Sequence, residues 1–317
     1  MGSQIIVTGS LAFDYIMDFP DAFRKHILPK QLHILNVGFL IPEMHQDFGG
    51  TAGNIAYTAA LLGGDPRIVS VIGSDGDGYL THLQRAGVST ELIRRFPRVR
   101  TASAYIITDR DDNQIAAFHP GASVFAKTCS IARVVPRAVL AIIAPNDIAA
   151  MRSFVDDCVA RNLPFVFDPG QALAGFSVGV LRACVTRAAF LIVNDYELRL
   201  LLQKTGWTEK ALLRIVPVVI TTLGAKGSVI QACNERIVVP PVSTKKVLDP
   251  TGAGDAYRAG FFTAFVRGLD FEICGRVGSV AATYAVETLG TQRHRFTRSQ
   301  FAARYERTYR QACPLPI

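Results

Sequence analysis

Several classes of protein are excluded by features that the sequence lacks. Its 317 residues contain no apolar run of ~18 residues, the length that a membrane-spanning helix requires. The N-terminus, residues 1–9, carries no basic segment and enters a strand pattern at once, so we do not interpret it as a signal peptide. We therefore expect a cytoplasmic protein without a membrane partner.

Cysteine is sparse and has no organised spacing. The six cysteines form no C-x-x-C pair, and none has the histidine spacing of a zinc site. We expect reduced and mostly buried thiols, as is usual in the cytosol. Their positions are Cys129, Cys158, Cys184, Cys233, Cys274 and Cys313.

The basic residues are dispersed rather than clustered. Lys and Arg number 34 against 26 Asp and Glu, a formal net charge of +8, but no run of five or more basic residues occurs. No RNA- or DNA-binding motif accompanies them, so we expect no nucleic-acid partner. The positive charge is compatible with attraction of polyphosphate substrates and equally with plain solubility.

Two familiar glycine-rich nucleotide motifs are also missing. No G-x-x-x-x-G-K-[ST] occurs, which excludes a P-loop enzyme. G-x-G-x-x-G fails as well, because the third position after Gly252 and Gly254 is Tyr257. This counts against a dinucleotide-binding dehydrogenase.

The pattern that is present alternates buried strands with helices. Apolar residues make up 49% and charged residues 19%, a composition that favours a large core over disorder. Such β–α–β alternation predicts an α/β fold with a doubly wound, mostly parallel sheet and helices on both faces. We expect one such domain over residues 1–317. Its predicted strands include 4–9, 67–72, 139–144, 164–169, 190–193 and 218–222, and its predicted helices include 55–64, 147–161, 195–203 and 256–266.

One stretch near the C-terminus, residues 249–257, combines glycines with acids in a way that suggests chemistry. If a helix starts at Ala253 or Gly254, the main-chain N–H groups of Gly252, Ala253 and Gly254 form an anion site at its positive end. Asp255 beside that site suits a general base that takes a proton from a hydroxyl attacking a phosphoryl group. The alternative is an ordinary acidic residue at the start of a helix.

This stretch resembles the C-terminal signature of the PfkB/ribokinase family of sugar and nucleoside kinases. Three other motifs are similar to those of the family and occur in family order. They are Gly49–Asn54, Asn194–Glu197 (N-x-x-E) and Thr221–Gly227 (T-x-G-x-x-G). Tyr257 and Arg258, the stretch 118–122 and the ending Gly290–Gln292 are most similar to bacterial adenosine and nucleoside kinases.

The resemblance implies a substrate site near the N-terminal motifs. Asp14, which follows the first strand, would hold substrate hydroxyls with Asn54, while Gly49 and Gly50 let a sugar approach the backbone closely. A carboxylate can accept hydrogen bonds from two vicinal hydroxyls, which suits a ribose. The alternatives are a loop or capping acid for Asp14 and a helix cap for Asn54.

Family members also carry a small β-sheet lid, which we expect from about residues 11–48 and 101–120. The alternating run 102–107, a turn at Asp111–Gln114 and the run 115–118 predict a lid hairpin. His119 is a substrate contact or a plain loop histidine. An exposed lid edge is compatible with a monomer or a homodimer.

The resemblance places ATP beside Asn194, Thr222, Gly224 and Gly227. Glu197 would hold Mg²⁺ through water, and the alternative is an acid of the following helix. Lys226 is expected either to contact a phosphate with its positive charge or to lie in solvent at the tip of the turn. Arg258 is expected either to reach the anion or to pair with Asp255. A helix over 281–290 would line the adenine pocket, with K⁺ a candidate ion in the loop after it.

The predicted function is an ATP- and Mg²⁺-dependent kinase that phosphorylates the 5′-hydroxyl of a ribonucleoside, with adenosine as the first candidate substrate. A sugar kinase for ribose or fructose is the alternative among enzymes. A catalytically silent nucleoside-binding module on the same fold is the alternative from another class.

Overall fold

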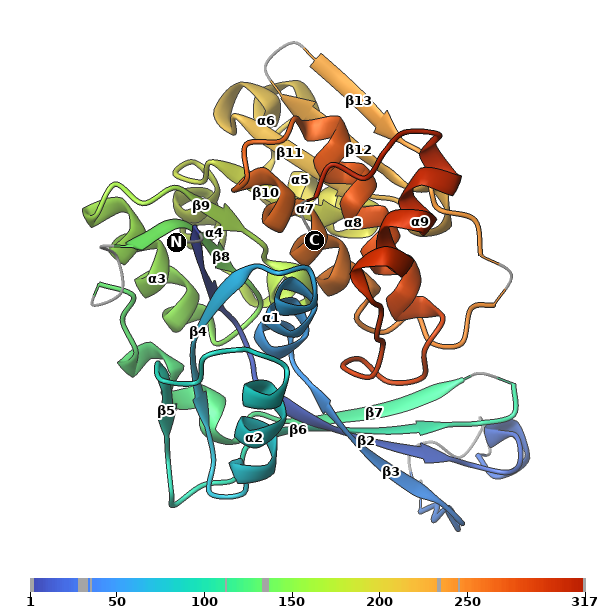
Figure 1. The fold of residues 1–317 in the computed structure, drawn as a ribbon. Coiled ribbons are helices and arrows are strands. Elements are labelled where there is room, and N and C mark those ends of the chain that lie inside the picture. The colour runs from blue at the N-terminus through green and yellow to red at the C-terminus, as the bar shows by residue number, and fades with distance from the viewer. Residues whose placement is uncertain are drawn as a thin grey trace.

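The main sheet is built as the strand pattern predicts (Figure 1). The computed structural model describes residues 3–27, 34, 36–111, 113–132, 137–232, 235–244 and 246–315. Its nine-stranded sheet has the order β13-β12-β11-β10-β9-β8-β1-β4-β5. Neighbours from β11 to β5 are parallel, and β12 and β13 add an antiparallel edge. The strands are β1 (Gln4–Thr8), β4 (Asp65–Ile72), β5 (Ile93–Arg95), β8 (Ala138–Ile143), β9 (Phe165–Phe167), β10 (Phe190–Asn194), β11 (Val218–Thr222), β12 (Ser228–Ala232) and β13 (Glu235–Val239).

Helices cover both faces of this sheet, so the predicted doubly wound fold is confirmed. Alternate residues of one strand enter different cores: Ile5 and Val7 of β1 join one cluster, and Ile6 joins the other. The first core contains α1 (Thr51–Leu61), α2 (Asp77–Arg85), α7 (Ala253–Phe265), α8 (Phe271–Val286) and α9 (Arg298–Tyr309). The second contains α3 (Ile148–Ala160), α4 (Val178–Val185), α5 (Asp195–Thr205) and α6 (Glu209–Ile215). No helix within the described residues is long and apolar enough to cross a membrane.

A four-stranded sheet projects from the main body as the expected lid (Figure 1). Its order is β3 (Met44–Gly49), β2 (Ala12–Asp18), β6 (Ala102–Thr108) and β7 (Gln114–His119). β6 and β7 form the predicted antiparallel hairpin, although Asp112 of its turn lies outside the described residues. Asp14 lies inside β2, so neither a loop nor a helix cap describes it.

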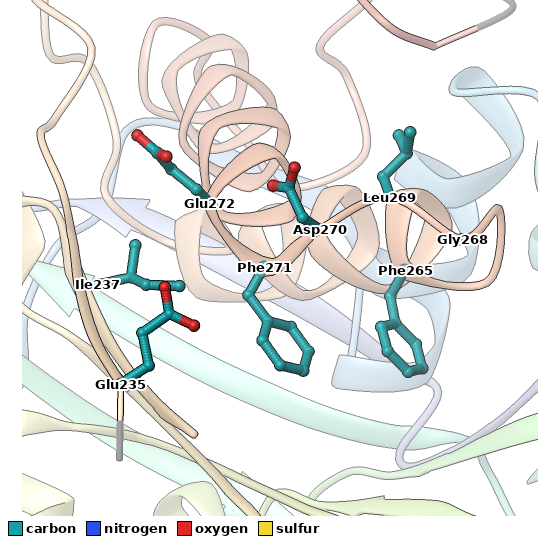
Figure 2. A pocket seen from close by; sticks show the side chains of 8 residues that line it. All are labelled: Glu235, Ile237, Phe265, Gly268, Leu269, Asp270, Phe271 and Glu272. Carbon is teal, nitrogen blue, oxygen red and sulfur yellow. The ribbon is translucent and has the colours of Figure 1, made fainter. Parts of the chain in front are cut away.

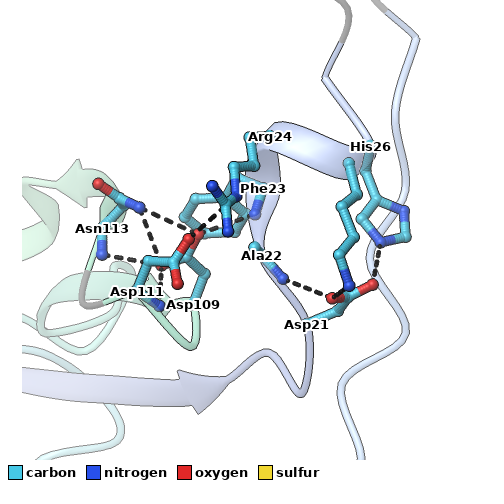
Figure 3. Close-up of polar contacts among 9 residues, drawn as sticks. Asp21, Ala22, Phe23, Arg24, His26, Asp109, Asp111 and Asn113 are labelled. Carbon is cyan, nitrogen blue, oxygen red and sulfur yellow. Dashed lines mark hydrogen bonds and ion pairs between the residues drawn. The ribbon is translucent and has the colours of Figure 1, made fainter.

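The far end of the lid is held together by a buried carboxylate (Figure 3). Asp109 accepts hydrogen bonds from the backbone N–H groups of Phe23, Asp111 and Asn113 at 2.8, 2.9 and 2.8 Å. Nearby, Asp21 accepts from the amide of Ala22. These bonds tie the turn after β6 to the segment after β2 and satisfy backbone donors that the short strands leave unpaired.

The start of α1 and the end of α8 differ from prediction, the first through a local backbone bond and the second through a tertiary contact. α1 begins at Thr51 rather than at residue 55, since the amide of Asn54 donates to the carbonyl of Gly50 and closes an earlier turn. α8 ends at Val286 rather than at Gly290. The backbone N–H groups of Leu248 and Asp249 donate to the Val286 carbonyl, which is thereby occupied by a distant loop.

Candidate active site

The carboxylate of Asp255 lies in the first turn of α7, where the sequence placed the start of a helix. Gly252 is the N-cap residue with a φ of +76°, a left-handed conformation that glycine adopts easily. Asp255 is only 8% exposed, and the Asn54 side chain on α1 donates a hydrogen bond from Nδ2 to Oδ2 at 2.8 Å. Burial raises the pKa of Asp255, and the charge of Arg258 and the bond from Asn54 lower it in part. The site therefore holds a basic, desolvated carboxylate.

The loop before α7 is pinned by Asp249. Its Oδ1 accepts from the amide of Thr251 at 2.8 Å, and its Oδ2 accepts from the amide of Gly290 at 3.1 Å. The amide of Ala253 donates to the carbonyl of Pro250 and so is engaged in the turn. No described residue accepts from the amides of Gly252 and Gly254, which leaves these two donors of the predicted anion site free.

On the lid side, the carboxylate of Asp14 stands directly over Gly49. A Cβ on Gly49 would lie 2.0 Å from Oδ2 of Asp14, so a side chain there would displace the carboxylate. Gly50 has a φ of +87°, and a Cβ there would lie 2.6 Å from the carbonyl oxygen of Ser10. No described residue donates a hydrogen bond to Asp14. Its oxygens therefore remain available to a substrate.

Asp14 shares its surroundings with other carboxylates. Burial, together with the negative charges of Asp47, Asp249 and Asp255, raises the pKa of Asp14 to about 7. Arg293 forms an ion pair with Asp47, but Asp14 has no such partner among the described side chains. Asp14 therefore titrates near neutral pH in the free protein.

This titration predicts a pH-dependent affinity for the acceptor substrate. The ionised form of Asp14 accepts two hydroxyl bonds, whereas the protonated form offers fewer acceptor sites. Below about pH 7 the KM for the acceptor should rise as the pH falls, and above about pH 8 it should level off. Steady-state kinetics from pH 5.5 to 9 measure this. The same profile for Asp14→Ala should be flat, and a wild-type KM that is flat across this range would contradict the assignment.

A buried hydrogen-bond chain orients Asn54. Gln292 donates from Nε2 to Oδ1 of Asn54 at 2.9 Å and to the hydroxyl of Tyr79 at 2.6 Å. The Tyr79 hydroxyl in turn donates to the carbonyl of Gly49. A Cβ at Gly53 would lie 2.0 Å from that hydroxyl, so glycine is needed there as well. With its Oδ1 engaged as an acceptor, Asn54 must present Nδ2 to Asp255.

Tyr79→Phe tests this chain. The change removes the donor to Gly49 and an acceptor of Gln292, leaving buried polar groups unpaired, so we expect a loss of about 1–3 kcal/mol in unfolding free energy. We also expect a several-fold lower kcat, because Asn54 loses its fixed orientation. Chemical denaturation and steady-state kinetics measure the two effects. Tyr309→Phe is the matched control, since this tyrosine lies on α9 and its hydroxyl makes a long, 3.5 Å bond to the carbonyl of Pro240. An unchanged stability and kcat in Tyr79→Phe would show that these hydrogen bonds do not orient Asn54.

The predicted nucleotide residues gather at the carboxyl ends of β10 and β11. Asn194 and Thr222 are partners in the parallel register, so they lie side by side. Gly224 and Gly227, with φ of +57° and +88°, turn the chain back, and the amide of Leu223 donates to the Gly227 carbonyl at 2.8 Å. A Cβ on Gly227 would lie 2.1 Å from the carbonyl of Val239. The glycines thus form a turn that side chains would block.

Glu197 and Asn194 cap α5 reciprocally. Oε2 of Glu197 accepts from the amide of Asn194 at 2.8 Å, and Oδ1 of Asn194 accepts from the amide of Glu197 at 2.7 Å. The capping role weighed from the sequence is therefore present. Burial raises the pKa of Glu197, and Asp168 adds to this. Among the residues described, no group of three His, Cys, Asp or Glu is arranged to hold a metal ion directly. One carboxylate with a free oxygen suits contact with a hydrated Mg²⁺ whose other ligands are phosphates and water.

Arg258 pairs with an acid that the sequence did not single out. Its Nη2 donates to Oδ1 of Asp168 at 2.8 Å, and its Nε lies 2.5 Å from Oδ2. The expectation of a pair with Asp255 is wrong, because Asp168 follows β9 and faces α7. The signal was available: Asp168 is an acid at the carboxyl end of a buried strand, the feature that identified Asp14.

A hollow elsewhere on the protein shares no lining residue with this site (Figure 2). It has a volume of about 660 Å³. Phe265 at the C-terminal end of α7 contributes to it, about 15 Å along the helix from Asp255 at ~1.5 Å per residue. Its other lining residues are Glu235, Ile237, Gly268, Leu269, Asp270, Phe271 and Glu272.

The fold and the site define a phosphotransferase that acts on a hydroxyl group. Residues 17–297 match the pfkB family of carbohydrate kinases. A nucleoside kinase of Methanocaldococcus jannaschii is 31% identical over 306 residues, covering 96% of this chain and 97% of that protein. Mouse ribokinase is 28% identical, covering 79% and 81%.

A solved structure extends the comparison. The nucleoside kinase of Burkholderia thailandensis in complex with inosine has a TM-score of 0.88 and 37% identity, covering 97% of this chain and 99% of that one. A second structure shows that enzyme in complex with ADP–inosine. The chain belongs to the pfkB family of carbohydrate kinases.

Proposed function

We propose that this protein is a nucleoside kinase that transfers the γ-phosphoryl group of ATP to the 5′-hydroxyl of a purine ribonucleoside. The observation that carries the proposal is the buried Asp255 carboxylate, held by Asn54 beside the free amides of Gly252 and Gly254. The 37% identical kinase that binds inosine supports a nucleoside acceptor, and its ADP–inosine complex supports ATP as donor.

The reaction follows from these groups. Asp14 accepts hydrogen bonds from the 2′- and 3′-hydroxyls and fixes the ribose. Asp255 takes the proton of the 5′-hydroxyl as its oxygen attacks the γ-phosphorus, and the bond to the β-phosphate oxygen breaks to release ADP. The amides of Gly252 and Gly254, with Ala253 once its turn bond opens, stabilise charge on the transferring group.

ATP would lie along Asn194, Thr222, Gly224 and Gly227, at the ends of β10 and β11. Mg²⁺ would contact Glu197 through water, and when bound it neutralises phosphate charge. A K⁺ site in the loop that follows Gly290, the choice between monomer and homodimer, and a cytoplasmic location stay predictions.

The test is ADP release from Mg-ATP with adenosine, inosine, guanosine, cytidine, ribose and fructose as acceptors. We expect turnover of the purine nucleosides, with kcat/KM at least tenfold above that of either free sugar. Turnover of ribose or fructose alone would establish a sugar kinase instead. Nucleoside binding by calorimetry with no turnover of any acceptor would establish the silent binding module.

A further inference from the structure

Arg258 is a buried cation immediately beside the proposed anion site. It lies on α7 three residues after Asp255 and four after Gly254, so it shares their face of the helix. Arg258 is 7% exposed, and its partner Asp168 is 1% exposed. Burial disfavours its charge, but Asp168 and Asp255 outweigh that effect and raise the pKa of Arg258. The guanidinium is therefore charged and held in place.

The guanidinium has one nitrogen that the ion pair does not use. Nε and Nη2 face Asp168, and Nη1 lies against Gly254, where a Cβ would be only 2.7 Å away. Side chains on a helix lean toward its N-terminus, so the guanidinium lies alongside the first turn of α7. Because residue 254 is glycine, no side chain separates Nη1 of Arg258 from the free amides.

Arg258 is surrounded by acidic residues, whose negative charge it offsets. Asp168, Glu197 and Asp255 all act on it, which gives three acids to one cation in a buried region that a phosphoryl group must enter. Without Arg258 these acids would repel that group. A guanidinium fixed on one edge by a carboxylate and free on the other is suited to phosphate oxygens.

We propose that Arg258 is a further catalytic residue, whose Nη1 binds the transferring phosphoryl group next to the amides of Gly252 and Gly254, and that Asp168 is its positioning residue. The inference rests on the proposed phosphoryl transfer but not on the identity of the acceptor. It adds a charged donor to an anion site otherwise made of neutral amides.

The experiment measures kcat and KM of Arg258→Met, Arg258→Lys and Asp168→Asn, with the best acceptor found for the wild type. We expect Arg258→Met to lower kcat by about 10²- to 10³-fold, as loss of one transition-state donor does, with the acceptor KM changed less than about threefold. Arg258→Lys should recover part of the loss, since lysine keeps the positive charge but not the planar set of N–H donors of a guanidinium. Asp168→Asn should lose about tenfold in kcat, because the guanidinium of Arg258 is no longer held by a carboxylate. The matched control is Arg276→Met, an arginine with a 16% exposed side chain that pairs with Glu272 in the first turns of α8.

The pH profile separates this role from an indirect one. The polar or charged groups that act on Asp255 include Asn54 and Tyr79, the acids Asp14, Asp168 and Glu197, and Arg258. If Arg258 only kept Asp255 ionised, the Arg258→Met enzyme would regain wild-type kcat at high pH. We expect its kcat to stay at least 30-fold low at every pH up to 10, and recovery to the wild-type plateau would overturn the proposal.

A variant that fails to fold does not end the test. Arg258→Met with Asp168→Asn removes the pair without leaving an unpaired buried charge, so we expect it to fold, with the kcat loss of Arg258→Met.

In Arg258→Ala, guanidinium ion should restore kcat at least tenfold, whereas ammonium should not. A kcat within threefold of wild type in the double variant would refute the inference while leaving the kinase assignment intact. Failure of the wild type with every acceptor would refute the proposed function itself.

Discussion

Asp255→Asn should lower kcat by about 10²- to 10⁴-fold, the range expected for loss of a general base. The asparagine keeps the size of the side chain and can still accept the bond from Asn54, so the KM of the acceptor should change little. Steady-state ADP release with a nucleoside acceptor measures both constants. Asp156→Asn, at an exposed aspartate on α3, controls for the loss of a charge.

The same substitution should not destabilise the protein. Burial raises the pKa of Asp255 above its unfolded value, so the native state binds a proton more tightly and ionisation of Asp255 opposes folding as the pH rises. A neutral asparagine removes this penalty, and the melting temperature at pH 8 should stay equal or rise. An inactive but equally stable variant would identify a functional carboxylate. Near-normal turnover of Asp255→Asn would end the assignment of Asp255 as the base.

Asp14→Ala should erase the enzyme's preference for ribonucleosides over 2′-deoxyribonucleosides. In the wild type, a hydrogen bond between the 2′-hydroxyl and the carboxylate is worth about 1.5–3 kcal/mol, so adenosine should exceed 2′-deoxyadenosine by about tenfold or more in kcat/KM. In Asp14→Ala the two substrates should differ by less than about twofold. Measuring both substrates with both enzymes isolates the contact from any general loss of activity.

Asp18→Ala is the matched control for this experiment, because Asp18 is an exposed acid at the end of the same strand, β2. It should retain the wild-type preference. If Asp14→Ala lowers activity equally for both substrates and the preference persists, Asp14 acts elsewhere than on the ribose hydroxyls.

Local patterns were sufficient to predict the main sheet, whereas the lid sheet was expected from the family resemblance. Strands such as β10 and β11 are short apolar runs bounded by polar residues, and their sequence directly indicates burial on both faces. Residues 252–255 also carry their conformation locally, because Gly252 tolerates the left-handed φ that starts α7. Features set by neighbours along the chain were therefore accessible.

Features set by distant neighbours were not. Gln292 contacts Asn54 and Tyr79 from more than 200 residues away, and only the folded chain reveals that chain of hydrogen bonds. Tyr79 carried no signal beyond its place in an ordinary helix. Likewise, the choice of Asp168 over Asp255 as partner of Arg258 depends on how β9 faces α7.

The measurement that most directly tests the central claim is ³¹P NMR of the product made from Mg-ATP and inosine. We expect ADP and a nucleoside monophosphate whose phosphorus couples to the two C5′ protons, with no product from 5′-deoxyinosine. A phosphate coupled to a single ribose proton, or turnover of 5′-deoxyinosine, would contradict transfer to the 5′-hydroxyl.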